Sequence, residues 1–164
     1  NLPARMHSYY LRQMYLNNRL VQPDSLNLLG ESINLSEIEV PSFFLSARQD
    51  HIAKWKTTYK GALAHGGDVR FVLSGSGHIA GVINPPYKEK YGYWTNDRLV
   101  PDADAWFEQS EHHPGSWWPH WLEWIGRFSD GDVPARVPGE GKLPAIENAP
   151  GSYVKVKAAD AAKQ

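Results

Sequence analysis

The sequence predicts an α/β fold in which buried parallel strands are flanked by helices. Two short apolar runs rich in strand formers, residues 40–46 and 69–73, lie on either side of a stretch typical of a helix, residues 54–65. Such runs are typical of parallel sheets covered by helices, and the order strand, helix, strand is that of a βαβ unit. An acid, Asp50, follows the first run, and a histidine, His78, follows the second.

The composition is that of an ordinary globular protein with one core. The chain has 164 residues, 41% of them hydrophobic, and its 17 basic and 18 acidic residues leave a net charge of −1. This balance gives no basic footprint for nucleic acid, and no apolar run approaches the roughly 18–20 residues of a membrane span. Cysteine is absent, which excludes disulfides and a cysteine nucleophile within this chain.

The first 38 residues predict a helix followed by a small hairpin. Residues 4–20 lack glycine and proline, and their apolar residues recur at helical spacing, as Met6 and Tyr10 do. Residues 22–24, Gln-Pro-Asp, are expected to end this helix. Short apolar pieces around a glycine in residues 24–38 predict the hairpin. The chain starts without methionine and enters the helical pattern at once, so we expect the C-terminal portion of a longer protein.

A glycine-rich turn, residues 74–77, follows the second predicted strand. Gly75 and Gly77 permit backbone angles that other residues avoid, so the turn is expected to be tight. Two prolines, residues 85–86, then predict an extended exit, and the polar and aromatic residues 87–99 predict irregular surface chain.

Two further helices are expected before a tail. Asp102 is a good cap for a helix over residues 102–111, and Ser116 is a good cap for a helix over residues 117–128. After Asp130 the composition shifts to Pro, Gly, Ala and charge, which predicts a tail with a disordered end. The second of these helices has one apolar face at spacings of 4, 3 and 4, formed by Trp117, Trp121, Trp124 and Phe128.

Asp50 and His78 together predict an acid–histidine pair. Ligands of open α/β sheets bind beyond the carboxyl ends of the strands, where neighbouring parallel strands lie about 4.8 Å apart. The acid would fix the tautomer of the imidazole, whose other nitrogen would then act as a base. The order acid, histidine is that of the last two triad members of α/β-hydrolases, with the nucleophile upstream. The alternatives are a carboxylate that caps the next helix and a turn histidine without a task.

The remaining histidines are weaker candidates. His51 adjoins Asp50 in sequence, so its ring is poorly placed for that acid to orient, and we expect it in a pocket wall. Residues 111–113, Glu-His-His, together with His120 suggest a metal site, but adjacent histidines point apart and Pro-Gly at 114–115 breaks helical spacing. We expect no metal there, and histidines packed against the tryptophan helix instead. That helix either packs on the sheet or presents a surface to a partner or an insoluble product.

Several motifs carry a family resemblance, in order along residues 4–157. They are YLRQMYLNN at 10–18, RQDHI at 48–52, GSGHIAGVINPP at 75–86, WTND at 94–97, HHPGSWWP at 112–119 and APGSYVK at 149–155. In these motifs the chain resembles the C-terminal portion of class I polyhydroxyalkanoate synthases, which polymerise (R)-3-hydroxyacyl-coenzyme A.

The resemblance implies an α/β-hydrolase catalytic domain with a Cys-His-Asp triad. Asp50 and His78 match the family's aspartate and histidine, and no position here matches its cysteine, so the chain alone is expected to be inactive. The resemblance also implies three segments. Residues 1–36 would be the end of a cap and its return to the core, residues 37–128 the C-terminal part of the catalytic core, and residues 129–164 a C-terminal tail.

The resemblance also implies a substrate and partners. The substrate would be a short-chain (R)-3-hydroxyacyl-coenzyme A, such as 3-hydroxybutyryl-coenzyme A, so coenzyme A is released and no cofactor is needed. The growing polyester, a homodimer partner and granule-associated proteins are expected, in the cytoplasm at polyester granules. His51, Ile79 and Ala80 flank the pair and are expected to shape the acyl pocket. The alternatives are a fragment of an α/β-hydrolase esterase or depolymerase, and a non-catalytic module that binds granules or a partner.

Overall fold

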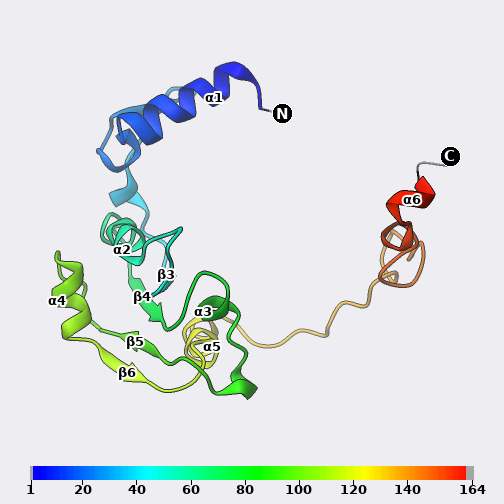
Figure 1. The fold of residues 1–164 in the computed structure, drawn as a ribbon. Helices are drawn as coiled ribbons and strands as arrows, with labels where there is room; N and C mark the ends of the chain where they lie inside the picture. The colour runs from blue at the N-terminus through cyan, green and yellow to red at the C-terminus, as the bar shows by residue number, and fades with distance from the viewer. Residues whose placement is uncertain (1, 162–164) are drawn as a thin grey trace. The chain divides into compact units, whose positions relative to one another are not determined.

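The computed structural model describes residues 2–161 (Figure 1). These residues fall into two units that divide between Arg127 and Phe128, and each is described by itself. The first unit holds a small hairpin and a four-stranded sheet with its helices. Asp50 and His78, the predicted acid–histidine pair, both lie in this unit.

The chain begins with helical turns that are shorter than predicted. Helix α1, Ala4–Tyr10, continues as the π-helix η1, Leu11–Leu16, and the 3₁₀ turn η2, Arg19–Val21, follows. The predicted helix over 4–20 therefore ends early, because Asn18 adopts a left-handed backbone with a φ of 46°. Asparagine is one of the few residues that tolerate this conformation, which interrupts a helix.

The predicted hairpin is confirmed. Strand β1, Leu26–Leu28, pairs antiparallel with β2, Glu31–Ile33, and the 3₁₀ turn η3, Leu35–Glu37, follows. The connection places Gly30 at a φ of 94°, where glycine is the residue that fits without strain.

The main sheet has the strand order β3-β4-β5-β6. Strands β3, Ser42–Ala47, and β4, Val69–Ser74, are parallel over six residue pairs, as predicted. Strands β5, Tyr93–Thr95, and β6, Glu111–His113, are antiparallel to their neighbours, so the sheet is mixed and not all-parallel as expected. The fold is nevertheless α/β, because the crossover from β3 to β4 runs through a helix.

Two predicted assignments are wrong in this part of the chain. Residues 87–99 are not wholly irregular, because β5 pairs with the outer edge of β4. The predicted helix over 102–111 ends at Glu108, since residues from Glu111 onward form β6. The cap is confirmed: Asp102 Oδ1 accepts the Ala105 N–H at 2.8 Å.

Helices cover both faces of the sheet. Helix α2, Trp55–Leu63, and helix α4, Ala103–Glu108, share a core on one face with Phe44 of β3 packed against it. Successive strand residues point to opposite faces, so Phe43 lies on the other side, under helix α5, Trp118–Gly126. The fully buried centre of the core is made by Tyr59, Ala62, Phe71, Leu73 and Trp106.

The tryptophan helix packs on the sheet through part of its predicted face. Trp117 and Trp124 are buried against Phe43, whereas Trp121 is half-buried and Phe128 is 49% exposed. The helix begins at Trp118, whose backbone N–H donates to Ser116 Oγ at 3.2 Å. The N-cap is therefore Trp117 and not Ser116 as predicted, and the helix runs from Trp118 to Gly126 and not over 117–128.

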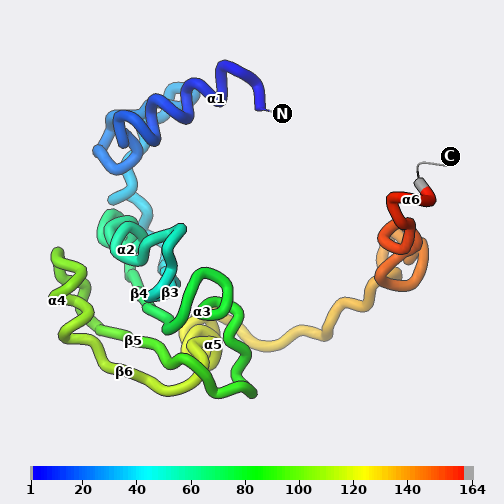
Figure 2. The backbone as a smooth tube through the Cα atoms, viewed as in Figure 1, coloured from blue at the N-terminus to red at the C-terminus, as the bar shows by residue number. Residues whose placement is uncertain are grey.

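The chain between β4 and β5 turns back on itself through a short helix, α3, Ala80–Ile83, and a 3₁₀ turn, η4, Pro86–Lys88 (Figure 2). Pro85 is extended, as predicted, but Pro86 begins η4. The second unit contains a 3₁₀ turn, η5, Tyr153–Lys155, and a short helix, α6, Ala158–Ala161.

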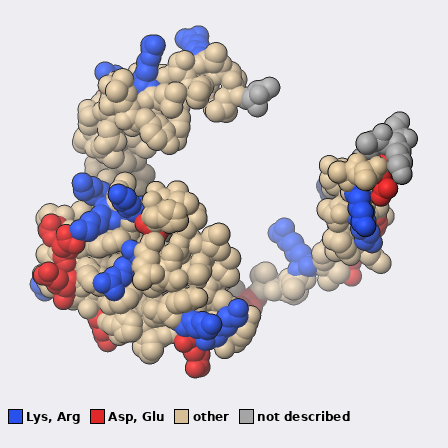
Figure 3. Space-filling model, viewed as in Figure 1, with Lys and Arg blue, Asp and Glu red and all other residues tan. Residues whose placement is uncertain are grey.

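The face shown in Figure 3 carries side chains of both charge signs with wide uncharged areas between them. Within residues 2–161, no helix is both long and apolar enough to cross a membrane.

Candidate active site

The structure brings Asp50 and His78 into contact at the carboxyl ends of two parallel strands. Asp50 lies three residues beyond β3 and His78 lies four residues beyond β4. Asp50 Oδ2 is 2.7 Å from His78 Nδ1. The Asp50 side chain is only 7% exposed, whereas that of His78 is 45% exposed. The acid is thus enclosed and the imidazole remains open to a reactant.

The second oxygen of Asp50 is held by the backbone. Oδ1 accepts the N–H groups of Ile52 at 2.8 Å and Ala53 at 2.9 Å. The hydrogen bond from His78 and these two backbone donors hold the pKa of the Asp50 carboxyl below its ordinary value. Asp50 therefore closes its own loop with one oxygen and meets the histidine with the other. It does not cap the next helix, which was the alternative considered from the sequence, because the N-cap residue of α2 is Lys54.

This geometry selects one tautomer of His78. An ionised carboxylate only accepts hydrogen bonds, so the proton of the neutral imidazole lies on Nδ1, facing Asp50. The other ring nitrogen, Nε2, then carries the lone pair and can accept a proton from a reacting group. The pair is chemically suited to act as a base.

Backbone hydrogen bonds hold the two loops side by side beyond the ends of the strands. Arg48 N–H donates to Ser74 O at 2.8 Å, and Gln49 N–H donates to Ser76 O at 2.9 Å. The pairing of β3 with β4 thus continues almost to Asp50. Its position relative to the histidine loop is fixed by backbone contacts and does not depend on the Asp50–His78 bond alone.

The glycine turn is tight for a different reason than predicted. The left-handed residue is Ser76, with a φ of 68°, and neither Gly75 nor Gly77 has a positive φ. Gly75 is needed because a Cβ there would overlap the carbonyl oxygen of Tyr91. Only a residue without a side chain allows the segment before β5 to pass this close to the histidine turn.

Arg48, which directly follows β3, packs against aromatic side chains of β5 and α4. Its guanidinium carbon lies 5.2 Å from the ring centre of Trp94 and 4.6 Å from that of Phe107, which are cation–π distances. This role of Arg48 was not predicted from the sequence. The signal available was weak, since the three residues lie on separate segments and only their residue types favour the contact.

The expected pocket residues divide into two groups. Ile79 and Ala80 line a hollow of about 260 Å³ directly beside the histidine turn, whereas His51 is exposed and does not line it. The other residues around this hollow were not predicted, and they are Ile83, Asn84, Pro85, Lys88, Lys90 and Tyr91. The wall is thus mainly apolar near His78 and carries two lysines farther along the chain.

The other histidines lie away from the pair. His113 Nε2 is 2.8 Å from Thr95 Oγ1, and the ring of His112 packs on Trp94. His120, on α5, packs between Phe43 and Tyr93. Of the three, only His120 belongs to the tryptophan helix against which all were expected to pack. Among residues 2–161, no group of three or more His, Cys, Asp or Glu side chains is placed to hold a metal ion.

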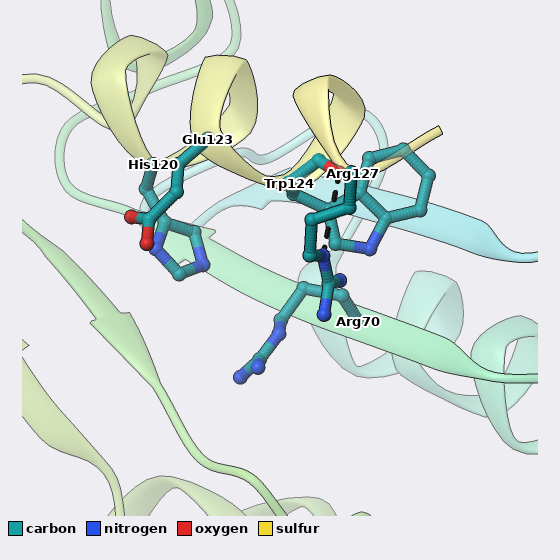
Figure 4. A pocket seen from close by; sticks show the side chains of 5 residues that line it. All are labelled: Arg70, His120, Glu123, Trp124 and Arg127. Carbon is teal, nitrogen blue, oxygen red and sulfur yellow. Dashed lines mark hydrogen bonds between the residues drawn. The ribbon is translucent and has the colours of Figure 1, made fainter. Parts of the chain in front are cut away.

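A second hollow, of about 100 Å³, lies between α5 and the start of β4, and its lining is polar (Figure 4). It is lined by Arg70, His120, Glu123, Trp124 and Arg127. Burial, reinforced by the charge of Arg70, lowers the pKa of His120. Arg70 also pairs with Asp97 at 2.8 Å. Because Arg70 is the second residue of β4 and His78 lies beyond its other end, this hollow is not part of the acid–histidine site.

An apolar hollow of about 230 Å³ lies on the outer side of α5. No charged side chain lines it, and Trp118 is 41% and Leu122 65% exposed at its edge. The remaining lining residues are Pro86, Pro119 and Trp121. The tryptophan helix thus packs on the sheet and also presents apolar surface, so the two alternatives weighed for it are not exclusive.

Comparison with known proteins identifies relatives over almost the whole chain. The chain is 47% identical over 157 residues to the poly(3-hydroxyalkanoate) polymerase subunit PhaC of Rhizobium meliloti, which is 96% of this chain and 25% of that protein. It is 44% identical over 158 residues to the poly(3-hydroxyalkanoate) polymerase of Methylorubrum extorquens, and 42% over 160 residues to the PhaC subunit of Cupriavidus necator. These matches cover 96% of this chain and 26% and 27% of those two proteins. The chain thus spans about a quarter of the length of the curated relatives it matches. No protein-family model matches it.

Proposed function

We propose that this chain, a homologue of the poly(3-hydroxyalkanoate) polymerases, supplies the acid and the histidine of a Cys-His-Asp triad in such an enzyme. The observation that carries the proposal is the 2.7 Å contact between Asp50 and His78 at the ends of adjacent parallel strands. The cysteine would come from outside this chain, which has none. Along the chain the acid precedes the histidine, as in α/β-hydrolases, and this order supports an α/β-hydrolase core as the setting.

In the first half-reaction, Nε2 of His78 takes the proton of the cysteine thiol. The resulting thiolate attacks the carbonyl carbon of a (R)-3-hydroxyacyl-coenzyme A, and the carbon–sulfur bond to coenzyme A breaks. The proton on His78 passes to the departing thiolate, so coenzyme A leaves as a thiol and the acyl group remains on the enzyme. A thiolate suits this exchange because the attacking and leaving groups are both thiols.

In the second half-reaction, the 3-hydroxyl of a further unit or of the chain end attacks the acyl-enzyme thioester, an ester bond forms and the carbon–sulfur bond to the cysteine breaks. The proton taken from the hydroxyl passes to the departing cysteine thiolate, which restores the thiol. The base for this hydroxyl is His78 and not Asp50. Both Asp50 oxygens are already engaged, and its side chain is 7% exposed, so a hydroxyl group has no free access to it. The imidazole, at 45% exposure, is the accessible partner.

The hollow lined by Ile79 and Ala80 is the candidate acyl site, because it is mainly apolar and adjoins His78. A short-chain acyl group and the growing polyester are the proposed substrates. Assembly as a homodimer at cytoplasmic polyester granules, with granule-associated proteins, is proposed with them from the family resemblance. His51 lies outside the hollow and has no role in this mechanism.

The test is His78→Gln in the full-length polymerase that contains this chain. Glutamine keeps hydrogen-bonding capacity but cannot accept the proton, so coenzyme A release from 3-hydroxybutyryl-coenzyme A should fall by about 10²–10⁴-fold. The matched control is His51→Gln, which alters the neighbouring exposed histidine and should retain nearly full activity. Retained release in His78→Gln, or an equal loss in both variants, contradicts the proposal.

A further inference from the structure

The short helix α3 connects directly to the histidine turn. It has four residues, Ala80–Ile83, and begins two residues after His78. The last four carbonyl groups of an α-helix lack partners within the helix, and α3 has only four residues, so its carbonyl groups need partners from elsewhere. A helix this short is not stable by itself, so other segments must hold it in place.

The start of α5 supplies donors for these carbonyls. Trp117 Nε1–H donates to Val82 O at 3.0 Å. Trp118 Nε1–H donates to Ile83 O at 3.1 Å and to Val82 O at 3.3 Å. Ser116, two residues before the first residue of α5, donates through its hydroxyl to Asn84 O at 2.6 Å. The motif Ser-Trp-Trp therefore closes the open end of α3 with three consecutive side chains.

The other end of α3 is tied to the strand that precedes His78. Ser74 Oγ–H, fully buried at the end of β4, donates to Gly81 O at 2.6 Å. Gly81 N–H donates to Gly77 O at 3.0 Å, which closes a turn around His78. The backbone of His78 is thus placed between a fixed strand end and a helix that is anchored at both ends.

We propose that Trp117 and Trp118 are positioning residues for His78, acting through α3, which rests on the function proposed above for His78. The imidazole is 45% exposed, and the bond to Asp50 holds it at Nδ1, so the position of the ring also depends on the backbone that carries it. Its direction depends on where the backbone of residues 77–84 lies. The two indole N–H groups fix that backbone without touching the imidazole.

The ring and the N–H group of Trp118 have separable roles. Trp118 is 41% exposed, whereas Trp117 is 8% exposed and packs on Phe43. Truncating Trp117 would therefore disturb the core. Replacing Trp118 by phenylalanine removes mainly the forked hydrogen bond to α3 and leaves Val82 O to the remaining donor on Trp117. Trp118 is the informative position.

The experiment follows the imidazole of His78 by NMR in the full-length protein that contains this chain, labelled at histidine and without substrate, so its outcome is independent of the activity test. In Trp118→Phe, exchange of the His78 Nδ1 proton with solvent should be about fivefold faster, since one hydrogen bond of typical net strength is lost. Trp121→Phe is the matched control on the same helix, because Trp121 makes a ring contact with Trp118, whereas the indole N–H groups that donate to α3 are those of Trp117 and Trp118. Exchange in this variant should change less than about twofold.

A second variant separates shape from hydrogen bonding. Replacing Trp118 by 3-benzothienylalanine keeps the bicyclic ring and removes the N–H, and it should reproduce the faster exchange. Unchanged exchange in that variant, or an equal change in Trp121→Phe, overturns the positioning role. If exchange changes as expected while His78→Gln keeps full activity, the positioning stands and the proposed function fails.

Discussion

The carboxylate of Asp50 hydrogen-bonds to its own loop through one oxygen and to the imidazole of His78 through the other. Oδ1 of Asp50 accepts two backbone N–H groups of its own loop, and Oδ2 lies 2.7 Å from Nδ1 of His78. The carboxylate cannot rotate without losing bonds at both oxygens. The orientation of the imidazole is thus fixed by the same loop that closes β3, before any reactant is bound.

The first prediction concerns Asp50→Asn in the full-length protein that contains this chain, and it rests on the function proposed above. The amide oxygen can keep the two backbone hydrogen bonds, but its NH₂ group then faces Nδ1 and favours the tautomer with the proton on Nε2. His78 would no longer present a lone pair to the thiol, so coenzyme A release should fall by at least about 100-fold.

The controls for this variant are its stability to urea and a second Asp→Asn variant away from the pair. At neutral pH Asp50→Asn should still unfold in one cooperative urea transition, because the loop keeps its closing bonds, with a midpoint somewhat below that of the parent because the carboxylate bond to His78 is lost. Asp24→Asn, in the loop before the hairpin, should lose no activity. Activity within about threefold of the parent in Asp50→Asn would show that the tautomer of His78 is not controlled by this acid.

The second prediction concerns stability in acid. The folded state holds the pKa of Asp50 below the ordinary carboxyl value of 3.8, so the unfolded chain binds the proton more readily. The contribution of Asp50 to the free energy of unfolding is therefore complete above pH 3.8 and is lost as the pH falls through the lowered folded value. Urea unfolding of this chain at a series of acidic pH values measures it.

Asp50→Asn again gives the comparison, since the amide does not titrate. The difference in unfolding free energy between the parent chain and this variant should shrink as the pH falls below 3.8. Asp97 also has a lowered pKa, through Arg70, and contributes equally to both proteins. A difference that stays constant with pH would mean that Asp50 is not stabilised as the carboxylate.

The βαβ unit and its two polar residues could be predicted because the signal is local. The runs that became β3 and β4 are long enough to be recognised as buried strands, and the helix between them ends at Leu63, three residues before two consecutive glycines. Parallel pairing then places whatever follows each strand at the same edge. The meeting of Asp50 and His78 follows from that topology.

The rest of the sheet depends on contacts that the sequence does not display. Strands β5 and β6 have three residues each, too few for an alternating pattern. β5 forms on the unpaired backbone groups at the edge of β4, and β6 forms on those at the edge of β5. The grouping of Arg48 with Trp94 and Phe107 is likewise non-local. Such contacts become visible only when the segments are placed in space.

Gly75 illustrates a further limit. A glycine in a turn suggests a left-handed backbone, but here Ser76 takes that conformation and Gly75 serves close approach instead. The two uses of glycine look the same in one sequence, because both require only the absence of a side chain. The neighbour that distinguishes them is Tyr91, sixteen residues away.

The last prediction tests this close approach with two Gly→Ala variants. Gly75→Ala places a methyl group against the carbonyl oxygen of Tyr91, which is backbone and cannot swing aside. The segment before β5 must shift, so the free energy of unfolding should fall by about 1–3 kcal/mol. Urea unfolding of this chain measures the change.

Gly126→Ala is the matched control because it adds the same methyl group near the end of α5, where no atom lies within 4 Å of the new Cβ. Alanine favours a helix over glycine, so this variant should be more stable than the parent by up to about 1 kcal/mol. The opposite signs distinguish a steric clash from a general effect of alanine. If Gly75→Ala were as stable as the parent, the packing of Tyr91 on the histidine turn would not be tight, and the turn would have room to move His78.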